Sequence, residues 1–437
     1  MSFLQLLVYR ILKILIRLFA RLYYPRTLML GRENFRLKGS NIVVANHPNT
    51  LIDPLSAAFR LDKPLFYLAN AGLYQYAFMR KLLNFLYAIR VERPQDVNGG
   101  RVNNDEAFKE AIAKLSAGYS IFIAPEGTSE MDRRLRPLRT GAARIALQAE
   151  AENGFSLGLR ILPIGLTYDK PEESGSGLVV YGGTPIPVKD WQQQYLEAPH
   201  AAVLSLTQAI SDRLAGLMLN PRSLEEDLLH RRLEEILDVM ASCAPKERWE
   251  RGRDLLKGLQ AFGVQDPTAM GALKEKVATY VRLKEKYRLS ECAFSENLVQ
   301  KWILPATLPL YAFAWVHHYL VPVWLLRVIA RKTQLYIGYS TTLKWVGAFL
   351  ILPFWYWMLI VFVPRMIPVS RGWYALALVV SGPVFVLLRP VWRDFIAVVK
   401  GIAGRWTHPR AWREMLALRG QLYSIASGWY GAKNQLG

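Results

Sequence analysis

Three long apolar stretches near the carboxyl end constrain this chain more than any other feature. Residues 302–326, 345–363 and 372–388 contain no Asp, Glu, Lys or Arg, and tryptophans stand at or near their edges. Stretches of this length can enter a bilayer, and tryptophan is enriched where a bilayer meets water. Prolines interrupt all three, so the sequence leaves open spanning, kinked and re-entrant arrangements. We expect a hairpin from the last two stretches, with the first in the membrane interface or dipping into it.

The amino-terminal segment predicts an amphipathic helix at a membrane surface. Leu and Ile dominate residues 3–24, and four cations recur at a three-four-four spacing: Arg10, Lys13, Arg17 and Arg21. This spacing places the cations on one helical face, a pattern typical of a helix lying in the membrane plane. A secretory signal would carry its charges before an uninterrupted apolar run, so that interpretation is rejected. A core helix with a solvated stripe is the alternative.

Composition narrows the class of partner. Lys and Arg number 55 against 35 Asp and Glu, a net charge of +20 that favours anionic lipid, phosphorylated small molecules or nucleic acid. We expect no nucleic-acid partner, because no motif that reads nucleic acid is recognisable and the cations accompany apolar segments. The two cysteines, Cys243 and Cys292, are too few for a disulfide framework, which favours a cytoplasmic setting.

Between the membrane elements, strand-like and helix-like patterns alternate. Strand-like runs occur at 42–45, 120–124, 160–165 and 177–181, and helical patterns at 104–118 and 140–152. This alternation predicts an α/β domain with a mainly parallel sheet. After it the strand pattern ends, and a capping box at Ser223 to Glu226 opens a helical pattern. The predicted parts are a membrane-surface helix at 1–35, an α/β domain at 36–190, a helical region at 191–301 and a membrane-associated region at 302–437.

A histidine and an aspartate follow the first strand-like run. His47 comes directly after Asn46, and Asp53 lies six positions beyond it, before Pro54. In open α/β sheets the carboxyl ends of strands face the ligand crevice. A carboxylate there can fold back to the imidazole, fix its tautomer and leave the other ring nitrogen as a general base. On spacing alone, a loop histidine and a helix-capping aspartate are an equally good interpretation.

No motif for a protein nucleophile, a nucleotide cradle or a zinc site accompanies this pair. The pair therefore suits transfer of a group to a hydroxyl that the substrate brings, and no metal is expected.

A second polar cluster follows the run at 120–124. It contains Glu126, Gly127, Thr128 and Ser129, and four arginines come after it: Arg133, Arg134, Arg136 and Arg139. Glycine allows close backbone approach, hydroxyls and amides bind oxyanions, and guanidinium groups match phosphate. Arg90 and Arg93 are further candidates for the same anion. A structural turn beside a solvated or lipid-facing arginine patch is the alternative.

Together these motifs resemble the glycerophospholipid acyltransferase superfamily, over about a third of the chain. Asn46-His47 with Asp53 resembles its first motif, whose histidine is the base and whose aspartate orients it. Arg93 matches the second-motif arginine that holds the substrate phosphate, and Pro125 to Thr128 matches the third motif. Leu138-Arg139-Thr140-Gly141 falls where the family has a basic residue followed by glycine. Leu162 to Gly165, with Pro163 and Ile164, resembles the fourth motif, near the acyl site.

The sequence departs from the family pattern at three places. Five residues instead of four separate His47 and Asp53, which resembles the subgroup of glycerol-3-phosphate and dihydroxyacetone-phosphate acyltransferases. Tyr87 stands where a glycine is common in the second motif, and Ser129 where the third often has arginine. Arg134 and Arg139 are the candidates to compensate in the phosphate pocket.

The resemblance implies an O-acyltransferase of phospholipid biosynthesis. It would move an acyl group from acyl-CoA or an acyl carrier protein thioester to a hydroxyl of glycerol-3-phosphate, without a bound cofactor. His47 and Asp53 would be catalytic, and the residues expected to hold the acceptor are Arg93, Glu126, Gly127, Thr128, Arg134 and Arg139. The expected setting is a membrane, with the catalytic domain on its cytoplasmic face among membrane lipids. The alternatives are a 1-acylglycerol-3-phosphate or other lysophospholipid acceptor, a non-glycerol hydroxyl, and a non-catalytic membrane-binding scaffold.

Overall fold

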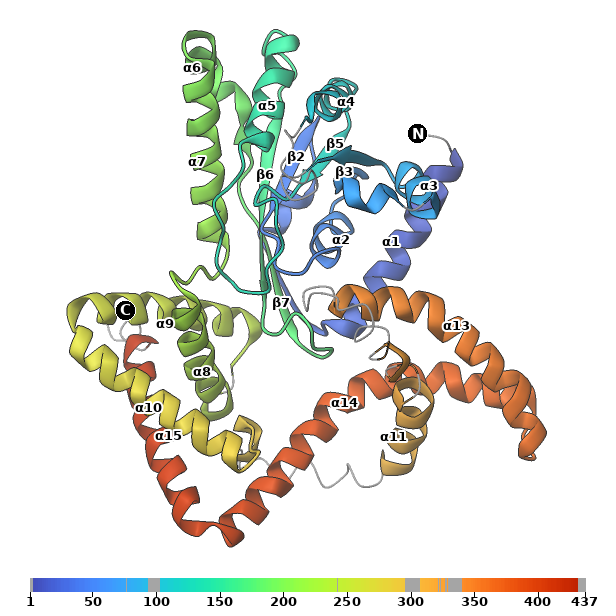
Figure 1. Ribbon diagram of the computed structural model, residues 1–437, viewed down its shortest axis with the longest axis vertical. Helices are drawn as coiled ribbons and strands as arrows, with labels where there is room; N and C mark the ends of the chain where they lie inside the picture. The colour runs from blue at the N-terminus through green and yellow to red at the C-terminus, as the bar shows by residue number, and fades with distance from the viewer. Residues whose placement is uncertain are drawn as a thin grey trace. The chain divides into compact units, whose positions relative to one another are not determined.

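A computed structural model gives the structure of the chain (Figure 1). It describes residues 3–75, 77–92, 103–241, 243–294, 307–320, 322, 324–326, 328 and 340–430. The chain divides into two compact units, one made mainly of Met1–Asn220 and the other mainly of Pro221–Leu335 and Leu343–Gly437. The finer division into four parts stays a prediction.

The first unit is built on a mainly parallel sheet, as the alternating pattern predicts. Its strands are β1 (Arg26–Leu30), β2 (Asn41–Ala45), β3 (Leu65–Asn70), β4 (Ala88–Val91), β5 (Ser120–Ile123), β6 (Arg160–Tyr168), β7 (Gly177–Gly182) and β8 (Ile186–Pro187). The order is β1-β7-β6-β2-β5-β3-β4, with β8 paired to β6. The pairs β6·β7 and β6·β8 are antiparallel, and the other pairs are parallel.

Strand β2 lies in the middle of this sheet, between β5 and β6. All five of its residues are buried, which explains why the run reads as continuously apolar instead of alternating. Full burial of a Val or Ile side chain stabilises the fold by about 1.5–3 kcal/mol. The sheet therefore holds the end of β2, and the residue that follows it, in a fixed place.

Helices complete the first unit. They are α2 (Ile52–Ala58), α3 (Ala77–Phe85), α4 (Asp105–Ser116), α5 (Gly141–Glu152), α6 (Gln192–Glu197) and α7 (Pro199–Leu217), with short 3₁₀ turns at Arg32–Phe35, Ala71–Gln75 and Val188–Trp191. Buried residues of α4, α5 and α7 join Ile42, Val44 and Ile121 in one core. Figure 1 shows these three helices beside the sheet. Gly165 of β6 makes room for α7, because a Cβ there would lie 2.3 Å from the Leu217 carbonyl oxygen.

The predicted amino-terminal helix is α1 (Phe3–Tyr23), but two of its cations bond the protein. The Lys13 ammonium and the Arg17 guanidinium donate to the backbone carbonyls of Leu61 and Phe59, at the end of α2. Apolar side chains of α1 remain exposed, among them Ile14 and Leu18. This arrangement is consistent with a membrane-surface helix, which stays a prediction.

The second unit is helical. Its first part contains α8 (Leu224–Met240), α9 (Pro245–Gln265), α10 (Pro267–Lys286), a 3₁₀ turn at Glu291–Phe294 and α15 (Pro409–Tyr430). The predicted cap is confirmed, because the Ser223 hydroxyl accepts from the Glu226 backbone N–H at 3.1 Å. At its centre the buried Glu291 carboxylate accepts from Lys284 at 2.6 Å and Arg419 at 3.2 Å.

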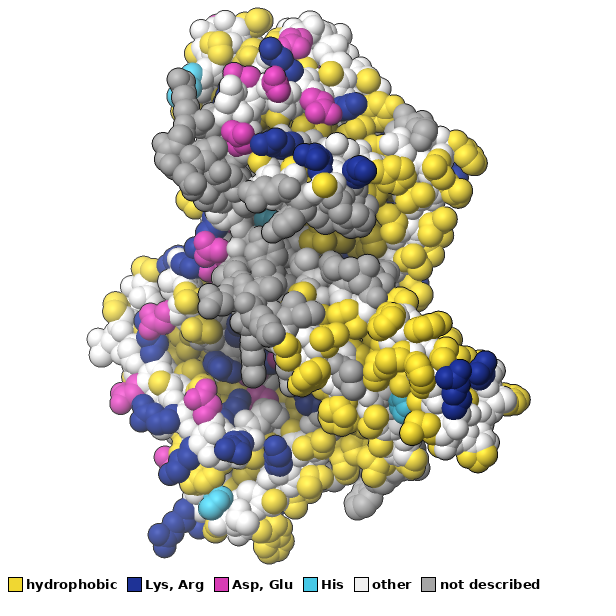
Figure 2. Space-filling view, turned by 45° about the vertical axis from the view of Figure 1, so that its right-hand side comes forward, with side chains coloured by type: hydrophobic (Ala, Val, Ile, Leu, Met, Phe, Trp, Pro, Cys, Tyr) yellow, Lys and Arg dark blue, Asp and Glu magenta, His cyan; other side chains and the backbone are white. Residues whose placement is uncertain are grey.

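The apolar stretches form helices in the same unit. They are α11 (Leu308–Trp315), a π-helical turn at Val316–Leu320, α13 (Ser340–Met366) and α14 (Arg371–Thr407); parts of 302–326 lie outside the described residues. Prolines 353, 364, 383 and 390 stand inside α13 and α14. Figure 2 shows hydrophobic side chains gathered over this part of the surface. Among the described residues one helix, α14, is long and apolar enough to cross a membrane by length and composition.

Candidate active site

The histidine at the end of β2 contacts the aspartate six residues later. His47 Nδ1 lies 3.0 Å from Asp53 Oδ2, and Asp53 stands in the first turn of α2, fully buried. An ionised carboxylate accepts hydrogen bonds and donates none, so Nδ1 carries the proton and Nε2 is left with its lone pair. Nε2 has no partner among the described residues, and the His47 side chain is 21% exposed.

Asp53 is held from three sides. Its Oδ2 also accepts from the Asn49 backbone N–H at 2.6 Å, and its Oδ1 accepts from the Tyr168 hydroxyl at 2.8 Å. Burial raises the pKa of Asp53, while the hydrogen bonds from His47, Asn49 and Tyr168 act against that rise. The carboxylate is thus fixed in position, and the effect of burial on its pKa outweighs that of the hydrogen bonds.

Two further contacts fix the turn between β2 and α2. The Asn46 side chain pairs with the Leu166 backbone in both directions, donating to its carbonyl at 2.8 Å and accepting from its N–H at 2.7 Å. Thr50 has a φ of 42°, a left-handed conformation that costs a β-branched residue about 1–2 kcal/mol. Its N–H donates to the Ser129 hydroxyl at 3.0 Å, so Ser129, a departure from the family pattern, supports this turn.

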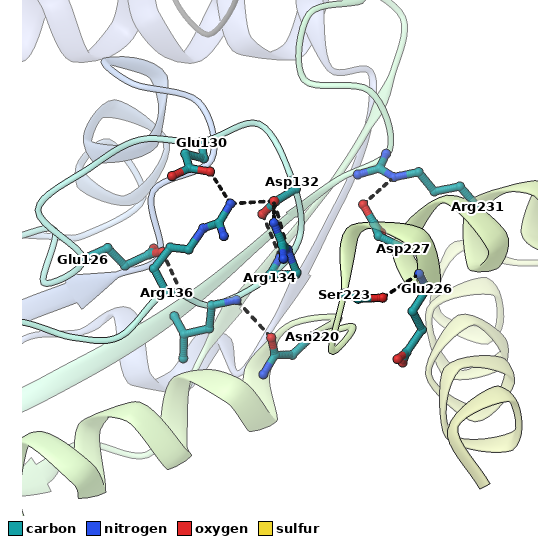
Figure 3. Close-up of polar contacts among 11 residues, drawn as sticks. Glu126, Glu130, Asp132, Arg134, Arg136, Asn220, Ser223, Glu226, Asp227 and Arg231 are labelled. Carbon is teal, nitrogen blue, oxygen red and sulfur yellow. Dashed lines mark hydrogen bonds and ion pairs between the residues drawn. The ribbon is translucent and has the colours of Figure 1, made fainter. Parts of the chain in front are cut away.

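The Glu126 carboxylate accepts hydrogen bonds from two separate backbone segments. Its Oε1 accepts from the His47 N–H at 2.7 Å. Its Oε2 accepts from the Arg136 N–H at 2.9 Å, as Figure 3 shows. The side chain is buried, and burial raises the pKa of this carboxyl. Because both oxygens already accept backbone hydrogen bonds, Glu126 joins the third motif directly to the residue that carries the imidazole.

The arginines after the third motif differ in how they are paired. Arg134 donates to Asp132 Oδ2 through Nε at 3.0 Å and Nη2 at 2.7 Å (Figure 3). Arg136 lies between Glu130 and Asp132 and pairs with both. Figure 3 therefore shows a local network in which these two guanidinium groups already have carboxylate partners.

Arg139 is different, since no carboxylate among the described residues pairs with it. It is exposed, and its backbone N–H donates to the Pro125 carbonyl at 2.7 Å. Gly127 has a φ of 71°, and a Cβ there would lie 3.5 Å from Arg139 Cγ, so the arginine side chain passes beside the glycine. Thr128, the next residue, is half-buried. Among the described candidates, Arg139 is thus the guanidinium best placed for an added anion.

Three candidate residues remain: Pro163, Ile164 and Arg93. Pro163 and Ile164 are buried in β6, where they pair in register with Val44 and Ala45 at the end of β2. Arg93 lies outside the described residues. Within the described part of the chain, no group of three His, Cys, Asp or Glu side chains is placed to hold a metal ion.

Sequence reasoning missed Tyr168. This residue is buried at the end of β6 and reaches Asp53 because β6 pairs with β2. No local pattern marks it, since a tyrosine at the end of an apolar strand is ordinary.

The comparisons with known proteins point to acyltransferases. The sequence model of the Acyltransferase family matches residues 27–167. "Glycerol-3-phosphate O-acyltransferase 2" of Saccharomyces cerevisiae (strain ATCC 204508 / S288c) is 28% identical over 121 residues, which cover 28% of this chain and 16% of that protein. The matched segment thus spans less than a fifth of the yeast protein.

A solved structure, that of the 1-acyl-sn-glycerophosphate (LPA) acyltransferase PlsC from Thermotoga maritima, is 20% identical and covers 46% of this chain and 76% of that one. Its TM-score of 0.32 is too low to support an argument about this chain. Residues 27–167 nevertheless form an acyltransferase domain. This domain belongs to the glycerophospholipid acyltransferase superfamily, which confirms the resemblance of its motifs.

Proposed function

We propose that this chain is an O-acyltransferase that moves a fatty acyl group from an acyl thioester to a hydroxyl of glycerol-3-phosphate. One observation carries the proposal: His47 Nδ1 is bonded to a buried carboxylate at 3.0 Å, while Nε2 has no partner among the described residues. A base oriented in this way takes a proton from a hydroxyl that approaches Nε2.

The proton then follows a closed path. Nε2 takes the proton of the acceptor hydroxyl as its oxygen bonds to the thioester carbonyl carbon. The resulting tetrahedral intermediate collapses, the carbon–sulfur bond breaks, and the imidazolium returns the proton to the leaving thiolate. The products are an ester and a free thiol. Asp53 stabilises the imidazolium between these two transfers, and Tyr168 and the Asn49 N–H keep the carboxylate in position.

Arg139 is the first residue we assign to the phosphate of the acceptor. Its guanidinium has no carboxylate partner among the described residues, and its side chain runs along Gly127 of the third motif. Arginine binds phosphate with two parallel hydrogen bonds, which fixes orientation as well as affinity. Arg134 and Arg93 remain candidates, and a phosphate at Arg134 would have to displace Asp132.

For Glu126 we propose a positioning role. Its two oxygens accept the backbone N–H groups of His47 and Arg136, so it holds the imidazole in place through the main chain. Gly127 and Thr128 then face the acceptor with their backbone and hydroxyl. Pro163 and Ile164, beside the end of β2, would lie near the acyl chain.

Glycerol-3-phosphate is the proposed acceptor for two reasons. The five-residue spacing between His47 and Asp53 resembles glycerol-3-phosphate acyltransferases, and the yeast relative carries that name. The donor would be acyl-CoA or an acyl carrier protein thioester.

We also propose that the chain works at a membrane, with the catalytic domain on the cytoplasmic face. Apolar side chains along α14 are exposed, Val379 to 69%, which suits a lipid environment better than water. The net charge of +20 favours the anionic cytoplasmic leaflet. Membrane lipids are therefore expected partners.

A competition assay tests the acceptor. The purified full-length chain in lipid nanodiscs is given an acyl-CoA with an isotopically labelled acyl group, together with equal concentrations of glycerol-3-phosphate and unlabelled 1-acylglycerol-3-phosphate, and both labelled products are quantified. Preferential formation of 1-acylglycerol-3-phosphate supports the proposal. Preferential formation of the diacyl product would show that the acceptor is a lysophospholipid and not glycerol-3-phosphate. If neither acceptor supports release of the thiol, the chain lacks the proposed activity.

A further inference from the structure

Helix α1 carries a stripe of exposed apolar side chains. These side chains recur every three or four residues, and they are Leu4, Leu7, Ile11, Ile14 and Leu18. Ile14 is 64% exposed and Leu18 58%. At 3.6 residues per turn this spacing gathers them on one side of the helix. A contiguous apolar surface of this kind marks a contact with a membrane or with another protein.

Two arginines flank this stripe without a partner. Arg10 and Arg21 are exposed, and neither has a hydrogen bond or an ion pair within the described part of the chain. Both lie on the face that carries Arg17, beside the stripe. In a helix at a bilayer interface, apolar side chains enter the acyl region and flanking cations contact the headgroups. Because the chain has a net charge of +20, this surface suits anionic lipid better than a second copy of the chain.

The cationic face of α1 also holds the end of α2. The Lys13 ammonium and the Arg17 guanidinium donate to the carbonyls of Leu61 and Phe59, Arg17 at 2.7 Å, and Figure 1 shows α1 beside α2. Cations are favoured at the carboxyl end of a helix, where carbonyl groups lack partners within the helix. Asp53 lies in the first turn of α2, which has only seven residues. The end that α1 holds and the Asp53 carboxylate therefore belong to one short, stiff element.

A second contact joins the carboxyl end of α1 to the candidate active site. Tyr24 comes directly after α1 and is buried. Its hydroxyl accepts from the Asn49 side chain at 2.9 Å, and its ring lies 5.3 Å from the Tyr168 ring. Asn49 and Tyr168 are the residues that bond Asp53 alongside His47. Residues of α1 and its end thus contact the turn before α2 as well as the segment after it.

We propose that α1 couples contact with an anionic lipid surface to the position of the catalytic pair. A bilayer that covers the apolar stripe favours the folded, bound helix, because it removes apolar surface from water. The bound helix then keeps α2 and Asp53 in place through Arg17 and Tyr24. These two are positioning residues, which act through Asp53 and its partners. The role of Asp53 rests on the proposed function, whereas the lipid contact does not.

Lipid contact is tested with a nitroxide spin label at position 14 of the full-length chain. Ile14→Cys is combined with Cys243→Ser and Cys292→Ser, so that one thiol takes the label. In nanodiscs of phosphatidylcholine with phosphatidylglycerol, we expect oxygen, which concentrates in lipid, to relax the label more than a water-soluble nickel complex does. The control is Leu204→Cys at an exposed position of α7, which should show the opposite order. Replacing Arg10 and Arg21 with Gln should reduce the oxygen effect at position 14.

Coupling is tested by hydrogen exchange of the α2 amides in the same nanodiscs. Arg17→Met removes the donor to the Phe59 carbonyl, and exchange should rise at least about tenfold, the effect expected for one charged hydrogen bond. The matched control is Arg10→Met, on the same face of α1, which should leave exchange within about twofold of wild type. Arg17→Lys keeps a cationic donor and should restore most of the protection. In a chain that transfers acyl groups, turnover should fall with this protection while the KM for glycerol-3-phosphate is unchanged.

Three outcomes would overturn the proposal. The first is a label at position 14 that the nickel complex relaxes more than oxygen does. The second is a spectrum broadened by a neighbouring label, which would identify a second copy of the chain as the occupant of the stripe. The third is equal exchange of α2 in Arg17→Met and Arg10→Met. The label and exchange measurements do not require acyl transfer, so a lack of that activity would count against the proposed function alone.

Discussion

The Tyr168 hydroxyl donates a hydrogen bond of 2.8 Å to Oδ1 of Asp53, from a position 115 residues later in the chain. Both side chains are buried, and the other carboxylate oxygen faces His47. The tyrosine therefore acts on the proposed base through the aspartate, without touching the imidazole itself.

Removing this hydroxyl should lower turnover while the contact between His47 and Asp53 remains. In Tyr168→Phe, Oδ1 loses a donor to a charged group, an interaction worth about 1.5–3 kcal/mol, so we expect turnover to fall on the order of tenfold. Without the Tyr168 hydrogen bond, which acts to lower the pKa of Asp53, that pKa rises further, so the acid limb of kcat/KM should move to higher pH. Tyr181→Phe, on the neighbouring strand β7, is the matched control. An unshifted acid limb in Tyr168→Phe would show that the hydroxyl does not tune the pair.

Asp53→Asn should lower turnover, and its stability relative to the wild type should increase as pH rises. Burial raises the pKa of Asp53, so the folded chain binds this proton more tightly than the unfolded chain. As pH rises from about 4, the ordinary value, towards the raised value, the wild type loses stability that the variant keeps. The thermal unfolding temperature of the variant minus that of the wild type should therefore increase as pH rises. Turnover should fall by about 10²–10⁴, since Asn does not stabilise an imidazolium. A difference that is constant with pH would contradict the raised pKa.

Arg139→Ala should raise the KM for glycerol-3-phosphate more than Arg134→Ala does. The Arg139 guanidinium has no carboxylate partner among the described residues, whereas Arg134 is bonded to Asp132. Loss of a charged hydrogen-bonding partner for phosphate predicts an increase of about tenfold or more, with a smaller effect on kcat. Arg144→Ala, on α5 beside Phe108, controls for loss of surface charge. The assignment of Arg139 is wrong if the Arg134 variant has the larger effect.

Helix α14 should hold the chain in the membrane through its apolar middle. Val379 and Val380 are exposed there, and a lysine at each position costs about 2.5–3.5 kcal/mol if the segment is inserted. We expect the Val379→Lys, Val380→Lys double variant to be released from membranes by alkaline carbonate, while Ile402→Lys, beyond the apolar stretch, stays in the pellet. Equal retention of both variants would argue against insertion of this segment.

The sequence predicts some parts of the fold and site because their signals are local. The run at β2 is recognisable because burial on both faces makes it continuously apolar, and the Ser223 cap is recognisable because a hydroxyl three residues before a glutamate bonds that glutamate's own N–H. The contact between His47 and Asp53 follows from a short turn after a strand. Such features need six residues or fewer of chain.

Features that depend on distant pairing were not predictable. Residues 26–30 fall within the segment 1–35 predicted as a membrane-surface helix, but they form strand β1, which pairs with β7 some 150 residues later. Tyr168 reaches Asp53 through the pairing of β6 with β2. Glu126 was expected to hold substrate, and its bond to the His47 N–H depends on how two loops meet at the end of the sheet. The left-handed backbone of Tyr87 has no sequence signal except its place in a motif where glycine is common.

The central claim is that His47 is the general base for acyl transfer, and it is tested most directly by turnover of His47→Ala. The purified variant in nanodiscs is compared with wild type for ester formation from an acyl-CoA and glycerol-3-phosphate, with thermal unfolding temperature as the measure of folding. We predict a loss of turnover of at least about a hundredfold at an unchanged unfolding temperature. A folded variant that retains turnover within a few fold of wild type would contradict the account.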